Sequence, residues 1–184
     1  MKFGLMTLIW GLTYLWIKLA VQEIGPFTLV SLRTVFAISG ILVLVWKQRT
    51  SINIRRWWPI FLFLGVINMG LPFVLTSWAG KIIPSGLSAI LNSTIPLWTI
   101  LIASAFLPEE RFTASRLMGI VFGFGGVIVL MSNRLSGELG PYQLGMLAML
   151  VSALLYAVSS VFIRLKGKGI PAEALSFGQL LFAW

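Results

Sequence analysis

The chain has no cysteine and no histidine, and only five of its 184 residues are acidic. Without cysteine it forms no disulfide and offers no thiolate to a metal. The absence of histidine removes the commonest proton shuttle and metal ligand. No catalytic triad, phosphate-binding loop or metal-ligand cluster is present in the sequence. We therefore expect no enzyme activity, no metal site and no cofactor.

The few carboxylates also limit proton transport. All five lie at or beyond the ends of apolar runs: Glu23, Glu109, Glu110, Glu138 and Glu173. A carboxylate that relays protons in a transporter lies within a membrane-spanning segment. Proton coupling through this part of the protein is therefore not expected.

Apolar residues are abundant instead. The chain is 58% hydrophobic and 10% charged, with a mean hydropathy of +0.96, whereas soluble domains are roughly 45–50% apolar and about 25% charged. A net charge of +9 does not indicate nucleic-acid binding here, because the basic residues lie at the ends of apolar runs. Composition predicts an all-α integral membrane protein in contact with the lipid bilayer.

Six runs have about the 20 residues that a helix needs to cross a bilayer. They cover residues 3–23, 27–46, 57–80, 84–107, 113–132 and 141–164. A seventh run, 172–184, has only thirteen residues in this sequence. The connections between the runs are short and rich in turn residues. The sequence thus predicts a transmembrane helix bundle.

Basic residues are distributed unequally between the two ends of these runs. One set of ends carries ten: Lys2, Lys47, Arg49, Arg55, Arg56, Arg111, Arg116, Arg164, Lys166 and Lys168. The opposite ends carry three: Lys18, Lys81 and Arg134. Because cytoplasmic segments carry the excess of Lys and Arg, the N-terminus is predicted to be cytoplasmic.

A faint internal repeat relates residues 8–19 to residues 154–165, an offset of 146. Five predicted helices separate the two copies, and an odd number inverts the second copy in the membrane. Inverted repeats with a binding site at their interface are a recurring plan of secondary transporters. Doubling the offset predicts a full protein of roughly 290 residues, about a hundred more than this chain.

Four stretches resemble successive signatures of EamA-type transporters of the drug/metabolite transporter superfamily. They are "WGLTYLWIKLA", "GPFTLVSLRTVFA", "SGLSAILNSTIPLWTILIASAFLPEER" and "RLMGIVFGFGGVIVLM". The resemblance implies ten helices in two inverted five-helix repeats, with both termini cytoplasmic. Residues 1–132 would form the first repeat and residues 141–184 the start of the second. It further implies a plasma-membrane transporter that exports or exchanges small metabolites by alternating access.

Arg33 is the one charge inside the run at 27–46, seven residues after Pro26 and about 10 Å into the membrane. A cation there costs roughly 2.5–3.5 kcal/mol on insertion scales. Three interpretations remain open: the side chain extends to the interface, it binds helix C-terminal carbonyls, or it contacts an anionic group of a substrate. Lys18, five residues from the end of the first run, is expected to extend to the interface.

Two spans carry a proline four residues after an asparagine: Asn68 before Pro72, and Asn92 before Pro96. Proline frees the carbonyl of residue i−4 and bends the helix. The polar side chains beside it either satisfy that backbone or line a cavity. The predicted substrate-cavity residues are therefore Arg33, Asn68 and Asn92, with the aromatic residues Trp10 and Tyr14.

Gly119, Gly123 and Gly126 lie on roughly one face of the fifth predicted helix. Small residues at this spacing allow close helix packing, and a homodimer through this face is the alternative. We expect a secondary transporter that moves small amino-acid-like or drug-like solutes outward. The alternative is a membrane scaffold or assembly subunit, for which the glycine face would matter most.

Overall fold

The computed structural model describes residues 2–49, 52–107, 109–110, 113–135 and 140–183, and the regular elements in this part of the chain are all helical. In chain order they are α1 Lys2–Ile24, α2 Pro26–Gln48, α3 Ile54–Leu64, the π-helical segment η1 Gly65–Gly70, α4 Leu71–Ile82, α5 Ser85–Asn92, α6 Ile95–Phe106, α7 Ala114–Leu135, α8 Pro141–Lys166 and α9 Ala172–Leu181. Predicted turn residues Arg111 and Glu138 lie outside the described residues, as does Trp184 at the end of the seventh run.

Five helical stretches within the described ranges are long and apolar enough to cross a membrane. They are Pro26–Gln48, Ile54–Ile82, Ser85–Phe106, Ala114–Ser132 and Pro141–Lys166. The first predicted run is helical as well, as the 23-residue α1. The predicted fold class, an all-α membrane bundle, is confirmed.

Both proline-containing spans are irregular where the sequence predicts it. The third is π-helical over Gly65–Gly70, which ends two residues before Pro72. The fourth is divided at Ser93 and Thr94 into α5 and α6. There the Ser93 hydroxyl donates to the Ile90 carbonyl at 2.6 Å, and the Thr94 hydroxyl donates to the Leu91 carbonyl at 2.7 Å. The same two carbonyls also accept from the backbone N–H groups of Ser93 and Thr94, so each hydroxyl adds a second hydrogen bond at the break.

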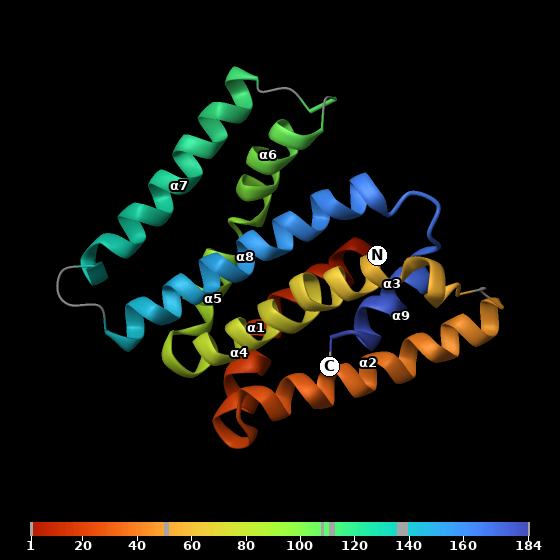
Figure 1. Cartoon of the computed structure of the whole chain (residues 1–184). Helices are drawn as coiled ribbons and strands as arrows, with labels where there is room; N and C mark the ends of the chain where they lie inside the picture. Colours follow the sequence, from red (N-terminus) through yellow and green to blue (C-terminus); the bar gives the residue numbers. More distant parts are fainter. Residues whose placement is uncertain (1, 50–51, 108, 111–112, 136–139, 184) are drawn as a thin grey trace.

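Helix α8 lies in the middle of the bundle, between α4 on one side and α6 on the other (Figure 1). Its buried face contributes to the apolar core, which consists of Ala79, Ile83, Leu91, Val127, Met131, Met146, Ala148 and Met149. The Ser152 hydroxyl lies 3.1 Å from the Thr76 hydroxyl and donates to the Pro72 carbonyl at 3.1 Å. Hydrogen bonds of this kind join helices where lipid offers no polar partner.

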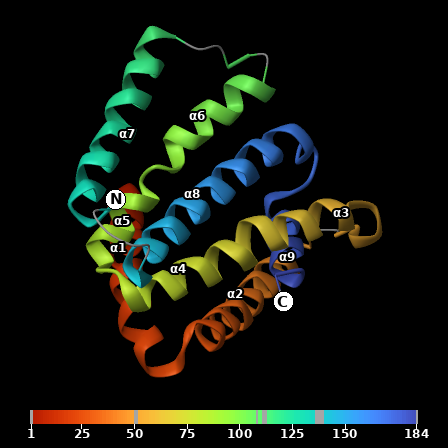
Figure 2. The ribbon, with the colours of Figure 1, turned by 60° about the vertical axis from the view of Figure 1, so that its left-hand side comes forward.

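The outer helices are held loosely by comparison. Turning the molecule separates the α6–α7 pair from α2, which lies along the opposite edge (Figure 2). Helix α2 packs against α1, α4 and α9, yet Thr34 is its one fully buried residue in the part described. The other side chains of α2 are half-buried or exposed. This loosely packed helix carries Arg33.

Candidate functional site

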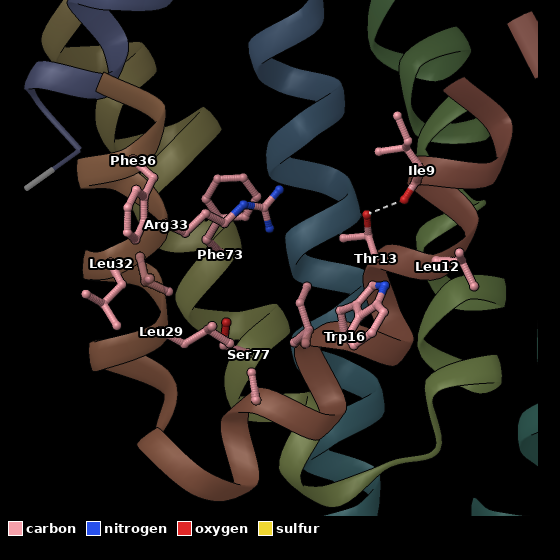
Figure 3. Close-up of a pocket in the computed structure, with 13 residues that line it drawn as sticks. Ile9, Leu12, Thr13, Trp16, Leu29, Leu32, Arg33, Phe36, Phe73 and Ser77 are labelled. Carbon is pink, nitrogen blue, oxygen red and sulfur yellow. Dashed lines mark hydrogen bonds between the residues drawn. The ribbon is translucent and has the colours of Figure 1, made fainter. Parts of the chain in front are cut away.

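A pocket of about 630 Å³ lies between α1, α2 and α4. This volume is in the range of small-molecule sites, about 300–1,000 Å³. Apolar side chains form most of its wall, among them Leu12, Trp16, Phe36 and Phe73, while Thr13, Arg33 and Ser77 are the polar ones (Figure 3). The pocket is therefore suited to a solute with a substantial apolar part.

The Arg33 guanidinium carbon is 4.2 Å from the centroid of the Phe73 ring (Figure 3). Phe73 in turn meets the ring of Tyr156 from α8 edge-on, at 6.3 Å between centroids. A cation over an aromatic face gains about 0.5–2 kcal/mol. That is less than the roughly 2.5–3.5 kcal/mol cost of a cation inside the bilayer. Phe73 thus offsets only part of the cost of holding Arg33 here.

Arg33 has unused hydrogen-bonding capacity. Over the described ranges, no hydrogen bond or ion pair to its guanidinium is found. Of the two hydroxyls on the pocket wall, that of Thr13 donates to the Ile9 carbonyl at 2.9 Å. A guanidinium carries five N–H donors in a fork that matches a carboxylate or phosphate. The pocket therefore presents one unpaired cation on an apolar wall.

Lys18 joins α1 to the end of α4, beside this pocket. Its ammonium donates to the Ile83 carbonyl at 2.9 Å and to the Gly80 carbonyl at 3.4 Å. The expected extension of Lys18 to the interface stays a prediction: its ammonium lies at the C-terminal end of the apolar span Ile54–Ile82, where unpaired carbonyls attract a cation. Gly80 allows the close approach, since a Cβ there would lie 3.3 Å from Ile17 Cγ2.

Asn68 lies in the π-helical segment, and both the nitrogen and the oxygen of its side-chain amide form hydrogen bonds. It donates to the Gln179 side-chain oxygen at 2.8 Å and accepts from the Ser159 hydroxyl at 2.7 Å. It therefore ties η1 to α8 and α9 and is not among the residues that line the Arg33 pocket. π-Helical segments of this kind are frequent at functional sites.

Asn92 ends α5 and does not line the Arg33 pocket either. Its side-chain oxygen is buried and, among the described residues, has no hydrogen-bond partner. The indole N–H of Trp98 in α6 is in the same situation. An unpaired buried polar group costs about 1–3 kcal/mol. These two atoms are places where a water molecule or a polar group of a solute would be stabilised.

Trp10 and Tyr14 lie on α1 outside the pocket wall. Trp10 is 66% exposed, and Tyr14 packs against the apolar core. Of the five predicted cavity residues, Arg33 alone lines the pocket between α1, α2 and α4. Sequence reasoning missed Phe73, the partner of Arg33, although an aromatic residue directly after Pro72 was a usable signal.

The three glycines of α7 differ in their surroundings. A Cβ on Gly123 would lie 2.6 Å from a Leu97 methyl group, so α6 packs closely there. At Gly119 and Gly126 nothing lies within 4 Å of the added atom.

Within the described part of the chain, no group of three or more acidic, cysteine or histidine residues is arranged to hold a metal.

Residues 3–132 match the EamA-like transporter family. The chain is similar to the uncharacterized transporter YoaV of Bacillus subtilis, with 25% identity over 176 residues, 95% of this chain and 60% of YoaV. Protein PagO of Salmonella typhimurium is 22% identical over 179 residues, 97% of this chain and 58% of PagO. The uncharacterized inner membrane transporter YedA of Escherichia coli is 27% identical over 161 residues, 84% of this chain and 49% of YedA. No solved structure matches the chain.

The chain spans at most 60% of the length of these three relatives. The family match nevertheless contains α1, α2 and α4, the three helices that form the pocket. The apolar helices and the names of the relatives agree on a multi-pass membrane protein related to transporters. The chain belongs to the EamA-like transporter family.

Proposed function

We propose that this protein carries small metabolites out of the cell, and that the solute is held in the pocket between α1, α2 and α4. The observation that carries the proposal is the unpaired Arg33 guanidinium on an apolar wall. An anionic group would bind the guanidinium, and an apolar body would lie against Trp16 and Phe36. Amino-acid-like and drug-like solutes combine these two features.

Two other interpretations of Arg33 predict different surroundings. A side chain that extended to the interface would leave the aromatic wall, whereas the Arg33 guanidinium lies over Phe73. An arginine that served as a helix tie would donate to backbone carbonyls, as Lys18 does. The cation–π contact keeps the charge inside the pocket while its N–H groups stay available to a ligand.

The transport mechanism we propose is alternating access between two inverted repeats. Residues 1–132 form the first repeat in this proposal, and residues 141–184 begin the second. Asn68, which is hydrogen-bonded, lies in the irregular third span. Asn92, whose side-chain oxygen has no partner among the described residues, lies in the irregular fourth span. Broken helices near the repeat interface are where such transporters bind their substrates. We therefore propose that the substrate pathway is lined in other conformations of the transporter by Asn68, Asn92, Trp10 and Tyr14.

The proposal also covers the membrane in which the protein lies, the side on which its N-terminus lies and its contact with a second copy. YedA is named an inner membrane transporter, and by analogy we propose the plasma membrane for this chain. The excess of basic residues at the ends that include Lys47 and Arg164 favours a cytoplasmic N-terminus. The open space at Gly119 and Gly126 leaves α7 free to contact a second copy, which would make a homodimer.

Flux measurements with Arg33 variants test the pocket. In cells that express the full-length protein, Arg33→Ala should abolish saturable efflux of anionic and zwitterionic solutes while membrane levels stay nearly normal. Arg33→Lys should keep partial flux with a weaker apparent affinity, because an ammonium lacks the planar fork. Lys81→Ala, which removes an exposed cation from the end of α4, is the matched control and should leave flux unchanged.

The solutes should be tested in pairs that differ only in charge, such as 3-phenylpropionate and its neutral amide. If Arg33→Ala reduces the flux of both members equally at matched expression, Arg33 does not contact an anionic group. If no solute in a panel of anionic, zwitterionic and neutral compounds shows saturable flux with the wild-type protein, the scaffold alternative is favoured.

A further inference from the structure

The end of α2 and the start of α3 carry an unusual concentration of cations and indoles. The basic–aromatic patch consists of Trp46, Lys47, Arg49, Arg55, Arg56, Trp57 and Trp58. No acidic residue occurs between Glu23 and Glu109, so the four cations have no neutralising carboxylate nearby in sequence. No ion pair to any of the four is found among the residues the structure describes. The patch is therefore a local excess of four positive charges.

The geometry of the patch leaves its α2 part open to an outside ligand. Helix α2 ends as Arg49 adopts a left-handed conformation (φ 52°), and the Arg49 N–H donates to the Trp46 carbonyl at 3.3 Å. A shallow pocket of about 610 Å³ lies there, lined by Val45, Trp46, Lys47 and Arg49. The Trp46 side chain is 82% exposed beside the two cations. The pocket thus combines an exposed indole with two cations that form no ion pair with any described residue.

The α3 part of the patch adds two more cations on the same side. The Arg56 guanidinium carbon lies 4.7 Å from the centroid of the Trp57 ring. Arg49 and Arg55 are six residues apart, and six residues span at most about 20 Å. Helices α2 and α3 meet at this end of the bundle, at the right of Figure 1. The four cations therefore act on one region of the surface.

We propose that the basic–aromatic patch binds the head group of an anionic phospholipid. The apolar span Pro26–Gln48 ends within the patch, so Trp46 and Lys47 lie at the boundary of the hydrocarbon layer. Tryptophan prefers the head-group level of a membrane. Clustered Lys and Arg directly beside a transmembrane helix attract anionic lipids. The phosphodiester lies between Lys47 and Arg49 in the α2 pocket, and the lipid chains lie along α2.

Lipid fits this patch better than a soluble anion does. A free phosphate would use the cations but not the exposed indole, whereas a phospholipid uses both and is already next to α2. Bound lipid would also affect the Arg33 pocket, because α2 forms part of its wall. Because α2 has one buried residue among those described, a contact at its end would add to the packing against α1, α4 and α9 that positions it. A lipid held at Lys47 and Arg49 steadies the helix that carries Arg33.

Native mass spectrometry of the full-length protein tests the proposal with dioleoyl phosphatidylglycerol as the probe. Dioleoyl phosphatidylcholine and inorganic phosphate are the comparison ligands. We expect wild-type protein to bind phosphatidylglycerol more tightly than phosphatidylcholine, and not to retain phosphate. The double variant Lys47→Gln/Arg49→Gln should lower the apparent affinity for phosphatidylglycerol on the order of tenfold, with binding of phosphatidylcholine unchanged.

The matched control is Lys166→Gln/Lys168→Gln, which removes two exposed cations beyond the end of α8. It should change the affinity for phosphatidylglycerol less than twofold. Equal losses in the two double variants, or equal wild-type affinities for the two lipids, would show that only general surface charge acts and would overturn the proposal. Tight retention of phosphate would identify an anion site without lipid preference and would overturn it as well.

A second measurement keeps every charge in place and guards against misfolding of the double variant. Phosphatidylglycerol brominated near the head group should quench wild-type tryptophan fluorescence more than brominated phosphatidylcholine does. Trp46→Phe should remove most of that difference, because Trp46 borders the α2 pocket. An unchanged difference in Trp46→Phe would contradict the assignment.

Discussion

Arg33 and Lys18, two cations inside the apolar bundle, are accommodated by different partners. Lys18 reaches the carbonyls of Gly80 and Ile83, so its charge is used within the fold. Within the described part of the chain, Arg33 contacts the face of Phe73 and forms no hydrogen bond or ion pair, so its N–H groups stay available. The sequence alone does not distinguish the two, because the partners of Lys18 are more than sixty positions away along the chain. At the scale of single residues, Lys18 is structural and Arg33 is the candidate for substrate contact.

Replacing Lys18 should destabilise the contact between α1 and α4. Lys18→Met keeps most of the apolar stem but leaves the Ile83 carbonyl without its charged donor. Hydrogen bonds to charged groups contribute about 1.5–3 kcal/mol, and partial exposure reduces this to about 1–2 kcal/mol here. SDS-induced unfolding in mixed micelles measures the change. Lys81→Met, at an exposed cation in the last turn of α4, should cost less than about 0.5 kcal/mol. Equal effects of both variants would contradict the role of Lys18.

At the scale of elements, the helices could be predicted more fully than the contacts between them. Apolar runs of about 20 residues mark the spans, and Pro72 and Pro96 mark the two irregular ones. The third helix nevertheless begins at Ile54, before the predicted residue 57. The Asn53 side chain caps the helix by accepting from the Arg56 N–H, and the first turn is helical although Arg55 and Arg56 are not apolar. The α1–α2–α4 pocket depends on how three helices cross. Helical periodicity shows which residues share a face but not which neighbour that face meets.

The packing of α9 on α3 rests on one glycine. A Cβ on Gly178 would lie 2.3 Å from the Phe61 ring, and Phe61 is fully buried. Gly178→Ala should therefore destabilise the protein by about 1–3 kcal/mol, since the ring has little room to move. Gly126→Ala on α7 meets open space and should be neutral or stabilising by up to about 1 kcal/mol, the gain in helix propensity. Unfolding midpoints of the two variants in mixed micelles compare them directly. A neutral Gly178→Ala would mean that α9 and α3 do not pack this closely.

At the scale of the whole molecule, ties at opposite ends of the bundle hold different pairs of elements. Lys18 joins α1 to α4 at the end where α4 finishes. At the other end, Glu110 accepts from Arg164 of α8 at 2.9 Å and from Arg116 of α7 at 2.8 Å. One carboxylate thus connects the turn after α6, the start of α7 and the end of α8. This tie links the family match, residues 3–132, to the helix that follows it.

Glu110 should make stability depend on pH in a defined window. Its hydrogen bonds with Arg164, and then those with Arg116, hold the pKa of the Glu110 carboxyl below its ordinary value of 4.5. Its contribution is therefore complete above about pH 4.5 and is lost as the pH falls through the lowered pKa. Glu110→Gln should lower the unfolding midpoint slightly at pH 7, and this difference from wild type should shrink below pH 4.5.

Glu109→Gln removes the same charge from the adjacent exposed residue and should shift the pH 7 midpoint less. High salt should reduce the Glu110 effect, because exposed ion pairs are screened. A difference between Glu110→Gln and wild type that stays constant from pH 7 to pH 3 would rule out the ion pairs as its source, since a protonated Glu110 no longer forms them.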